Sequence, residues 1–158
     1  MKLLHKLFAK RYHLITHDQS FHADDVMAYA ILQEVLERRG ACWKLTRSRD
    51  ESVIARGDIV FDTGNQYDPT TNRYDHHQAE RAGARDNGVM YASAGLVWKH
   101  FGREICSSDD VWQSIDRCLI QEIDSGDSGQ NYIGTLLFTD SGYTSLGIHI
   151  ANFGPTGD

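Results

Sequence analysis

The hydrophobic positions of the chain fall into short apolar runs and longer amphipathic stretches. Apolar runs over residues 12–18, 43–48 and 58–64 are bounded by polar residues or glycine, a pattern typical of buried strands. Residues 23–40 form a long amphipathic stretch that ends at a glycine and therefore predicts a helix. The inner stripe expected for this helix consists of Val26, Ala30, Leu32, Val35 and Leu36.

The second half of the chain continues this alternation. A turn at Asp68-Pro69 precedes a short extended piece, and two further helices are predicted over residues 90–102 and 107–129. Strands that alternate with helices imply parallel pairing through right-handed crossovers. We therefore expect an α/β fold with a mostly parallel sheet and helices on both faces. The glycine-rich apolar segment after Gly129 predicts no clear element.

Length and composition are those of an ordinary globular protein. The chain has 158 residues, 41% hydrophobic and 24% charged, which suits a single domain over residues 1–158. No apolar run approaches the roughly 20 residues that cross a bilayer, and the three scattered cysteines fit a reducing compartment. These features predict a cytoplasmic protein without a membrane partner. The basic segment over residues 1–13 is also compatible with a short organelle-targeting helix.

Polar side chains that can bind cations follow the predicted strands. They are His17, Asp62, Asp75, His76 and His77. Ligands of parallel sheets collect at the carboxyl ends of the strands, so we expect these side chains to converge. The net charge of −6 argues against nucleic-acid binding through a broadly basic surface, but bound cations can supply positive charge locally.

Some of these residues also have simpler explanations. Asp24 and Asp25 can cap the helix that begins near them, although capping does not account for His22. An adjacent pair of histidines is often a surface accident. Asp124, near the end of the last predicted helix, is unfavourable beside the helix dipole unless a cation lies close to it.

Four segments together resemble a known family. "THDQSFHADDVMA", "VFDTG…YDPTTNRYDHHQ", "SAGLVWKHFG" and "EIDSGD" are similar to the N-terminal domain of the melanocyte-proliferating-gene-one family, which is related to the DHH phosphoesterase superfamily. Two departures are Gln19, where the family usually has glycine, and "DTGNQ" (62–66), where it has a more glycine-rich turn. Family members have a second domain, which we expect to be absent or truncated in this chain.

The resemblance implies a site with two divalent cations, usually Mn²⁺, with Mg²⁺, Fe²⁺ or Zn²⁺ as alternatives. The implied metal ligands are His17 and His22 for one ion, Asp24, His76 and Asp124 for the other, and Asp62 as the bridge. Asp75 would orient an imidazole or a water molecule, and His77 would face the phosphate or the leaving group. Arg81 and Arg85, in the polar loop after the histidines, are the candidate phosphate contacts.

The function implied by the resemblance is metal-dependent phosphodiester hydrolysis by two-metal activation of water. The expected activity is that of a 3'-5' exonuclease on RNA or single-stranded nucleic acid. One alternative keeps the chemistry but uses a small phosphorylated substrate such as pyrophosphate. Another is a non-catalytic module that binds metal for stability. The sequence carries no indication of the oligomeric state.

Overall fold

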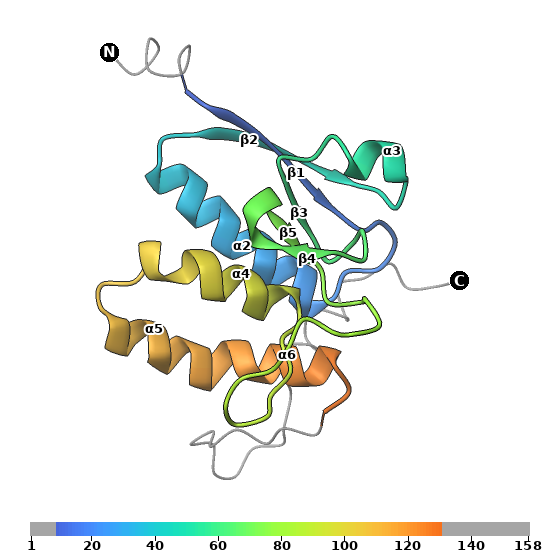
Figure 1. Ribbon diagram of the computed structural model, residues 1–158. Helices are drawn as coiled ribbons and strands as arrows, with labels where there is room; N and C mark the ends of the chain where they lie inside the picture. Colours follow the sequence, from blue (N-terminus) through green and yellow to red (C-terminus); the bar gives the residue numbers. More distant parts are fainter. Residues whose placement is uncertain (1–8, 131–158) are drawn as a thin grey trace.

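The computed structural model describes residues 9–130 and contains a five-stranded sheet (Figure 1). The strands are β1 (Arg11–Thr16), β2 (Cys42–Arg47), β3 (Ile59–Phe61), β4 (Tyr67–Asp68) and β5 (Arg73–Tyr74). Their order is β2-β1-β3-β5-β4. Only the edge strand β4 is antiparallel to its neighbour. The predicted α/β class with a mostly parallel sheet is therefore confirmed.

Helices fill the connections between the strands and follow the sheet. They are α2 (Ala23–Arg38), α3 (Glu51–Ile54), α4 (Ser93–Phe101), α5 (Asp109–Ile115) and α6 (Gln121–Asp127), with 3₁₀ turns at Pro69–Thr71 and Gly102–Glu104. In the view of Figure 1, α2, α4, α5 and α6 lie below β1 and β2. The single helix expected over residues 107–129 is instead two helices, α5 and α6, joined by a π-helical turn, Asp116–Ile120. The sequence analysis also missed the one-turn helix α3 and the edge strand β4.

The buried side of α2 differs from the stripe expected from the sequence. Its hydrophobic members are Ala28, Ile31, Leu32, Val35 and Leu36. Ala30 is exposed and Val26 is only partly buried, so the prediction was wrong at these two positions. The stripe begins at Asp24 and Asp25, which are both buried. Because its first turn carries acids rather than aliphatic side chains, the hydrophobic pattern alone gave the wrong phase.

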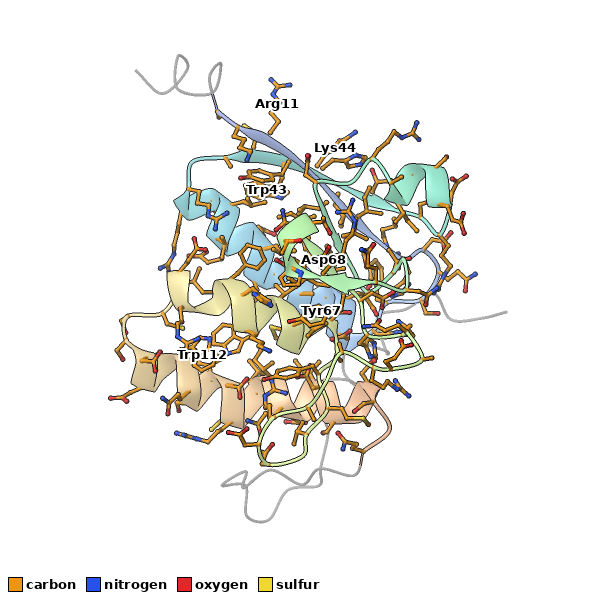
Figure 2. All side chains as sticks on the ribbon, in the orientation of Figure 1. Arg11, Trp43, Lys44, Tyr67, Asp68 and Trp112 are labelled. Carbon is orange, nitrogen blue, oxygen red and sulfur yellow. The ribbon has the colours of Figure 1, made fainter. Side chains whose placement is uncertain are left out.

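Aromatic side chains join the helices to each other and to the sheet. Trp98 of α4 stacks on Trp112 of α5 with ring centroids 6.2 Å apart and an interplanar angle of 1°. At the other end of the molecule, Trp43 of β2 donates a hydrogen bond to the hydroxyl of Tyr29 on α2 (3.4 Å; Figure 2). These contacts join α4 to α5 and α2 to β2, and α4 also packs against both α2 and α6.

The carboxyl ends of three adjacent strands define one edge of the sheet. β1 leads directly into His17, β3 into Asp62 and β5 into Asp75. Because β1, β3 and β5 are neighbours and run parallel, these three residues emerge side by side. The sheet topology thus positions the candidate site, as the rule for parallel sheets predicts.

Two segments considered above lie outside the described residues. They are the start of the basic N-terminal segment and the glycine-rich run after Gly129, from residue 131 onward. Between residues 9 and 130, the structure has no helix with the length and apolar character required to cross a membrane.

Candidate metal centre

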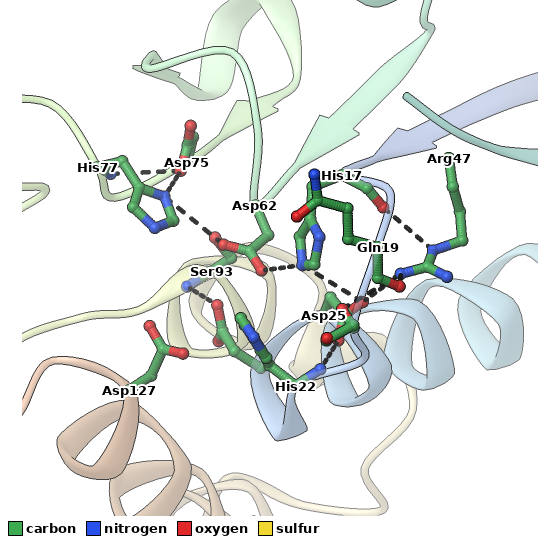
Figure 3. Close-up of polar contacts among 12 residues, drawn as sticks. His17, Gln19, His22, Asp25, Arg47, Asp62, Asp75, His77, Ser93 and Asp127 are labelled. Atoms are coloured by element: carbon green, nitrogen blue, oxygen red, sulfur yellow. Dashed lines mark hydrogen bonds and ion pairs between the residues drawn. The ribbon is translucent and has the colours of Figure 1, made fainter. Parts of the chain in front are cut away.

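Asp62 lies at the centre of the candidate site, between two groups of histidines. Its Oδ2 is 3.2 Å from Nε2 of His17 (Figure 3). Its Oδ1 is 3.6 Å from Nε2 of His76. The residue has a left-handed backbone (φ 52°), which aspartate tolerates better than most residues but which still stores strain. The turn after β3 thus aims the two carboxylate oxygens in different directions.

His17, His22 and Asp62 form the first group that could hold a cation, with one potential ligand atom from each within 4.8 Å of the others. Nδ1 of His17 lies 2.7 Å from the carbonyl oxygen of Asp18. If Nδ1 donates to that carbonyl, Nε2 carries the lone pair and is the metal-binding nitrogen. The loop after β1 therefore presents a preoriented imidazole to Asp62.

Asp24, His76 and Asp127 form a second group of the same kind. Nε2 of His76 lies 3.0 Å from Oδ2 of Asp127 and 3.8 Å from Oδ2 of Asp24. Asp127 was missed by the sequence analysis. The available signal was the spacing of the two aspartates in "EIDSGD", Asp124 and Asp127, which lie three positions apart and so share one face of a helix.

The two acids at the start of α2 have different partners. Asp25 accepts a hydrogen bond from the backbone N–H of His22 (2.8 Å), so it caps its own helix. Asp24 instead accepts from the N–H groups of Ser93 (3.0 Å) and Ala94 (2.6 Å) at the start of α4. Capping by Asp24 thus ties α2 to α4 and leaves Oδ2 facing His76.

Asp75 orients the neighbouring histidines. Its Oδ1 lies 2.7 Å from Nδ1 of His77 and accepts from the N–H of His76 (2.7 Å), while its Oδ2 accepts from the N–H of Asn65 (2.6 Å). The His77 side chain is 52% exposed, whereas that of His76 is 2% exposed. Consecutive histidines therefore face different surroundings, one the buried cluster and the other the solvent. Asp62, Asp75, His76 and His77 make up the third potential cation group.

Arg85 and Asp124, expected to contact phosphate and metal respectively, contact each other in the structure. Nη1 of Arg85 lies 2.6 Å from Oδ2 of Asp124, and its Nη2 and Nε bind Asp116 at 2.8 and 3.0 Å. Asp124 also accepts from the N–H of Gly95 (2.9 Å). The cation beside Asp124 is thus a guanidinium, and Asp124 belongs to none of the three potential metal groups of residues 9–130. Arg81 is exposed.

The electrostatics of the cluster favour an added cation. Burial opposes charge on His76, but the carboxylates of Asp127 and Asp62 outweigh burial and raise its pKa to about 10. Burial also raises the pKa of Asp24, and the neighbouring carboxylates of Asp62 and Asp127 raise it further. For Asp62, burial is outweighed by the two imidazoles it contacts, so its pKa is lowered. Positive charge that protons provide here can equally be provided by metal ions.

Buried atoms without hydrogen-bond partners give an independent test of this fit. They include Nε2 of His17, both ring nitrogens of His76 and Oδ1 of Asp62. Such atoms are costly to bury without a partner, and several face one another across the cluster. A set of imidazole and carboxylate donors suits Mn²⁺, Fe²⁺ or Zn²⁺ better than Ca²⁺. The buried histidine and aspartate groups could therefore hold metal ions.

Comparison with known proteins places the chain in a family. The model of the family MYG1_exonuc, described as an uncharacterised protein family (UPF0160), matches residues 13–156. The chain is 33% identical to "MYG1 exonuclease" of Mus musculus over 132 residues, 72% of the chain and 34% of the mouse protein. It is 30% identical to "MYG1 protein" of Chlamydia trachomatis serovar D over 142 residues, 89% of the chain and 44% of that protein.

The chain belongs to the MYG1 (melanocyte-proliferating-gene-one) family, as its motifs predicted. It spans less than half the length of these curated relatives. No solved structure matches it. The segments that carry the site, from His17 to Asp127, all lie within the matched residues.

Proposed function

We propose that this chain carries the catalytic site of a divalent-metal-dependent phosphodiester hydrolase, a 3'-5' exonuclease on RNA or single-stranded nucleic acid. The observation that carries the proposal is the position of Asp62, whose two oxygens face His17 and His76 separately. The name of the mouse relative, an exonuclease, supports the choice of substrate.

We propose that the cluster holds two cations, with Mn²⁺ as the ion. One would be held by His17, His22 and Asp62, and the other by Asp24, His76 and Asp127. Asp62 would also serve the second ion, because its Oδ1 lies 3.6 Å from Nε2 of His76. The contacts of Asp124 with Arg85 and Gly95 favour Asp127 as the carboxylate that α6 contributes. This sharing of Asp62 follows the bridging role that the relation to DHH phosphoesterases suggests.

The cations would supply Lewis-acid stabilisation of the phosphodiester and an activated water molecule as the nucleophile. The residues around them bind and orient the reacting groups. His77 is held by Asp75 through Nδ1, so its Nε2 is directed away from this carboxylate. The hydrogen bond to Asp75 also raises the pKa of His77, which favours the protonated form. From this position Nε2 of His77 can donate a hydrogen bond to a phosphate oxygen or a proton to the leaving oxygen.

Substrate contacts are proposed for the loop that follows the histidines. Arg81 is exposed there and has no ion pair among the described residues. Arg85 is occupied by Asp116 and Asp124, so it is a weaker candidate for a phosphate contact. Positive charge at Arg81 would add to the attraction that the cations exert on a polyanion.

The proposal is tested with metal-free protein and end-labelled single-stranded RNA. We expect stepwise shortening from the 3' end on addition of Mn²⁺, inhibition by a chelator, and no shortening with Asp62→Asn. Parallel measurement of phosphate release from pyrophosphate tests the alternative that the substrate is a small phosphorylated molecule. Intact RNA in the presence of tightly bound Mn²⁺ contradicts the proposed activity.

A further inference from the structure

Asp124 contacts Arg85 and Gly95, and the proposed mechanism uses none of these three residues. We propose that these three residues form a clamp that holds α6 in the position at which Asp127 reaches His76. The clamp rests on the proposed metal site, because it assigns Asp127 to the ligands and Asp124 to their support. Arg85, Asp124 and Gly95 are then positioning residues.

The guanidinium of Arg85 is the centre of the clamp. Its side chain is only 8% exposed, and it binds two carboxylates of one helical segment, Asp116 and Asp124. The carboxylate of Asp116 is held further by Gln121, whose Nε2 donates to its Oδ2 at 2.7 Å. A buried guanidinium with these partners cannot leave them without a large cost, since a charge would remain unpaired. The loop that carries Arg85 is thereby fixed to α6.

The π-helical turn gives Arg85 access to both acids. In a regular α-helix, residues eight positions apart, such as Asp116 and Asp124, point about 80° apart around the axis. One extra residue in a single turn brings them to within about 20° of each other. The turn Asp116–Ile120 supplies this extra residue directly between them. A local departure from α-geometry thus places both carboxylates on the side that faces Arg85.

Gly95 provides the surface against which Asp124 rests. Its N–H donates to Oδ1 of Asp124 at 2.9 Å. A β-carbon at this position would overlap the carboxylate and lie 2.7 Å from Cγ of Asp124. The glycine is therefore required for space in the first turn of α4. Any larger residue would displace Asp124 or the helix that carries it.

The first turn of α4 connects the two helices that contribute carboxylates to the second metal group, α2 with Asp24 and α6 with Asp127. The N–H groups of Ser93 and Ala94 hold Asp24, and the next N–H, of Gly95, holds Asp124. Asp127 follows Asp124 by three positions on the same face of α6, close to one helical turn away. Three successive amides therefore set the spacing between Asp24 on α2 and Asp127 on α6, the two carboxylates that flank His76.

The test is a double-mutant cycle with Gly95→Ala and Asp124→Ala, read by Mn²⁺ titration calorimetry on the full chain. Gly95→Ala should weaken Mn²⁺ binding about tenfold, the usual scale for residues that support metal ligands. In the Asp124→Ala background the same change should have less than a twofold effect, because the overlapping carboxylate is gone. Gly126→Ala is the matched control, since a β-carbon there meets nothing within 4 Å.

Stoichiometry separates a positioning role from direct ligation. We expect Asp124→Ala to keep two bound ions at reduced affinity and Asp127→Asn to lose one. The reverse result, with an ion lost in Asp124→Ala and both retained in Asp127→Asn, would overturn the clamp. Thermal unfolding of each variant shows whether a change in stability alone accounts for the affinities.

A conservative variant covers the case in which Gly95→Ala does not fold. Arg85→Lys keeps the charge but loses the planar fork that binds two carboxylates, and we expect weaker Mn²⁺ binding by a folded protein. Wild-type affinity in Arg85→Lys contradicts the clamp and leaves the proposed activity untouched. Conversely, a wild-type protein that binds two ions but leaves RNA intact contradicts the activity and leaves the clamp in place.

Discussion

Nε2 of His76 lies 3.0 Å from Oδ2 of Asp127, although the contact does not have the geometry of a hydrogen bond. His76 lies just after strand β5 and Asp127 is the last residue of α6, so the pair connects the sheet to the layer of helices. Nε2 of His76 also faces Asp24 and Asp62, and Asp127 lies close to Asp24. A cation shared among these donor atoms would satisfy more of them than the direct contact between His76 and Asp127 does.

Replacement of the bridging residue tests the shared position of Asp62. Asp62→Asn keeps the shape of the side chain, and asparagine tolerates the left-handed backbone at this position (φ 52°) as well as aspartate does. It removes the negative charge between the two groups, so we expect loss of turnover by at least about 100-fold and weaker binding of both ions. Calorimetric titration and RNA cleavage are the measurements. A variant with wild-type rate in Mn²⁺ would show that the site assignment is wrong.

The adjacent histidines should differ in the consequences of their removal. His76 is buried among the potential ligands, so His76→Ala should reduce the amount of bound metal. His77 is more than half exposed and is held by Asp75, so His77→Ala should keep the metal but slow the reaction. Metal content by mass spectrometry of the native protein, beside the cleavage rate, distinguishes the two. Equal metal loss in both variants argues against this division.

Metal binding should strengthen as the pH rises. In the metal-free protein the pKa of His76 is raised to about 10, so at pH 7 the ring carries a proton that a metal ion must displace. Binding therefore releases a proton, and the affinity should rise by about tenfold per pH unit below pH 10 for this one site. Calorimetry in two buffers with different ionisation enthalpies counts the released protons. Affinity independent of pH from 6 to 8 contradicts the expectation.

Gln19 should be a strained position at which glycine stabilises the fold. It has φ 74°, a left-handed conformation that costs a non-glycine residue about 1–2 kcal/mol. Its carbonyl accepts from Arg47, a backbone contact that Gln19→Gly preserves. After the entropic cost of glycine, we expect a gain of up to about 1 kcal/mol in the free energy of unfolding. Urea denaturation measures it, with Ser20→Gly as the control that should destabilise. Equal destabilisation by both changes would show that Gln19 is unstrained.

Replacement of the exposed Arg81 should weaken RNA binding without changing the affinity for Mn²⁺. Arg81 has a left-handed backbone (φ 57°), so Arg81→Asn removes the charge without adding strain. We expect weaker RNA binding, a salt dependence lower by about one unit of slope, and unchanged Mn²⁺ affinity. Binding is measured by fluorescence anisotropy at several salt concentrations. An unchanged slope removes Arg81 from the list of phosphate contacts.

The main elements of the fold were predictable because the apolar runs are short and well separated. The runs that became β1, β2 and α4 appear within a few residues of the predicted ranges. Two features were hidden from this reading. The first is the start of the buried stripe of α2, which consists of acids, and the second is the π-helical turn within an otherwise continuous helical pattern. Hydrophobic periodicity detects neither, because buried acids do not count as hydrophobic and the turn leaves the hydrophobic pattern unbroken.

The convergence of His17, Asp62 and His76 could be expected from strand ends that share one edge of the sheet. The choice between Asp124 and Asp127 could not, because both acids lie on one face of a single helix. Contacts with residues distant in sequence distinguish them: Asp124 contacts Arg85 and Gly95, whereas Asp127 contacts His76. Contacts between remote polar residues leave no periodic signal in a sequence.

The most direct measurement of the central claim is anomalous scattering from a crystal soaked in Mn²⁺. Two peaks roughly 3.5–4 Å apart are predicted, the spacing of two-metal hydrolases. Both should contact Asp62, one beside His17 and the other between His76 and Asp127. A single peak, or peaks that do not share Asp62, would contradict the two-metal site.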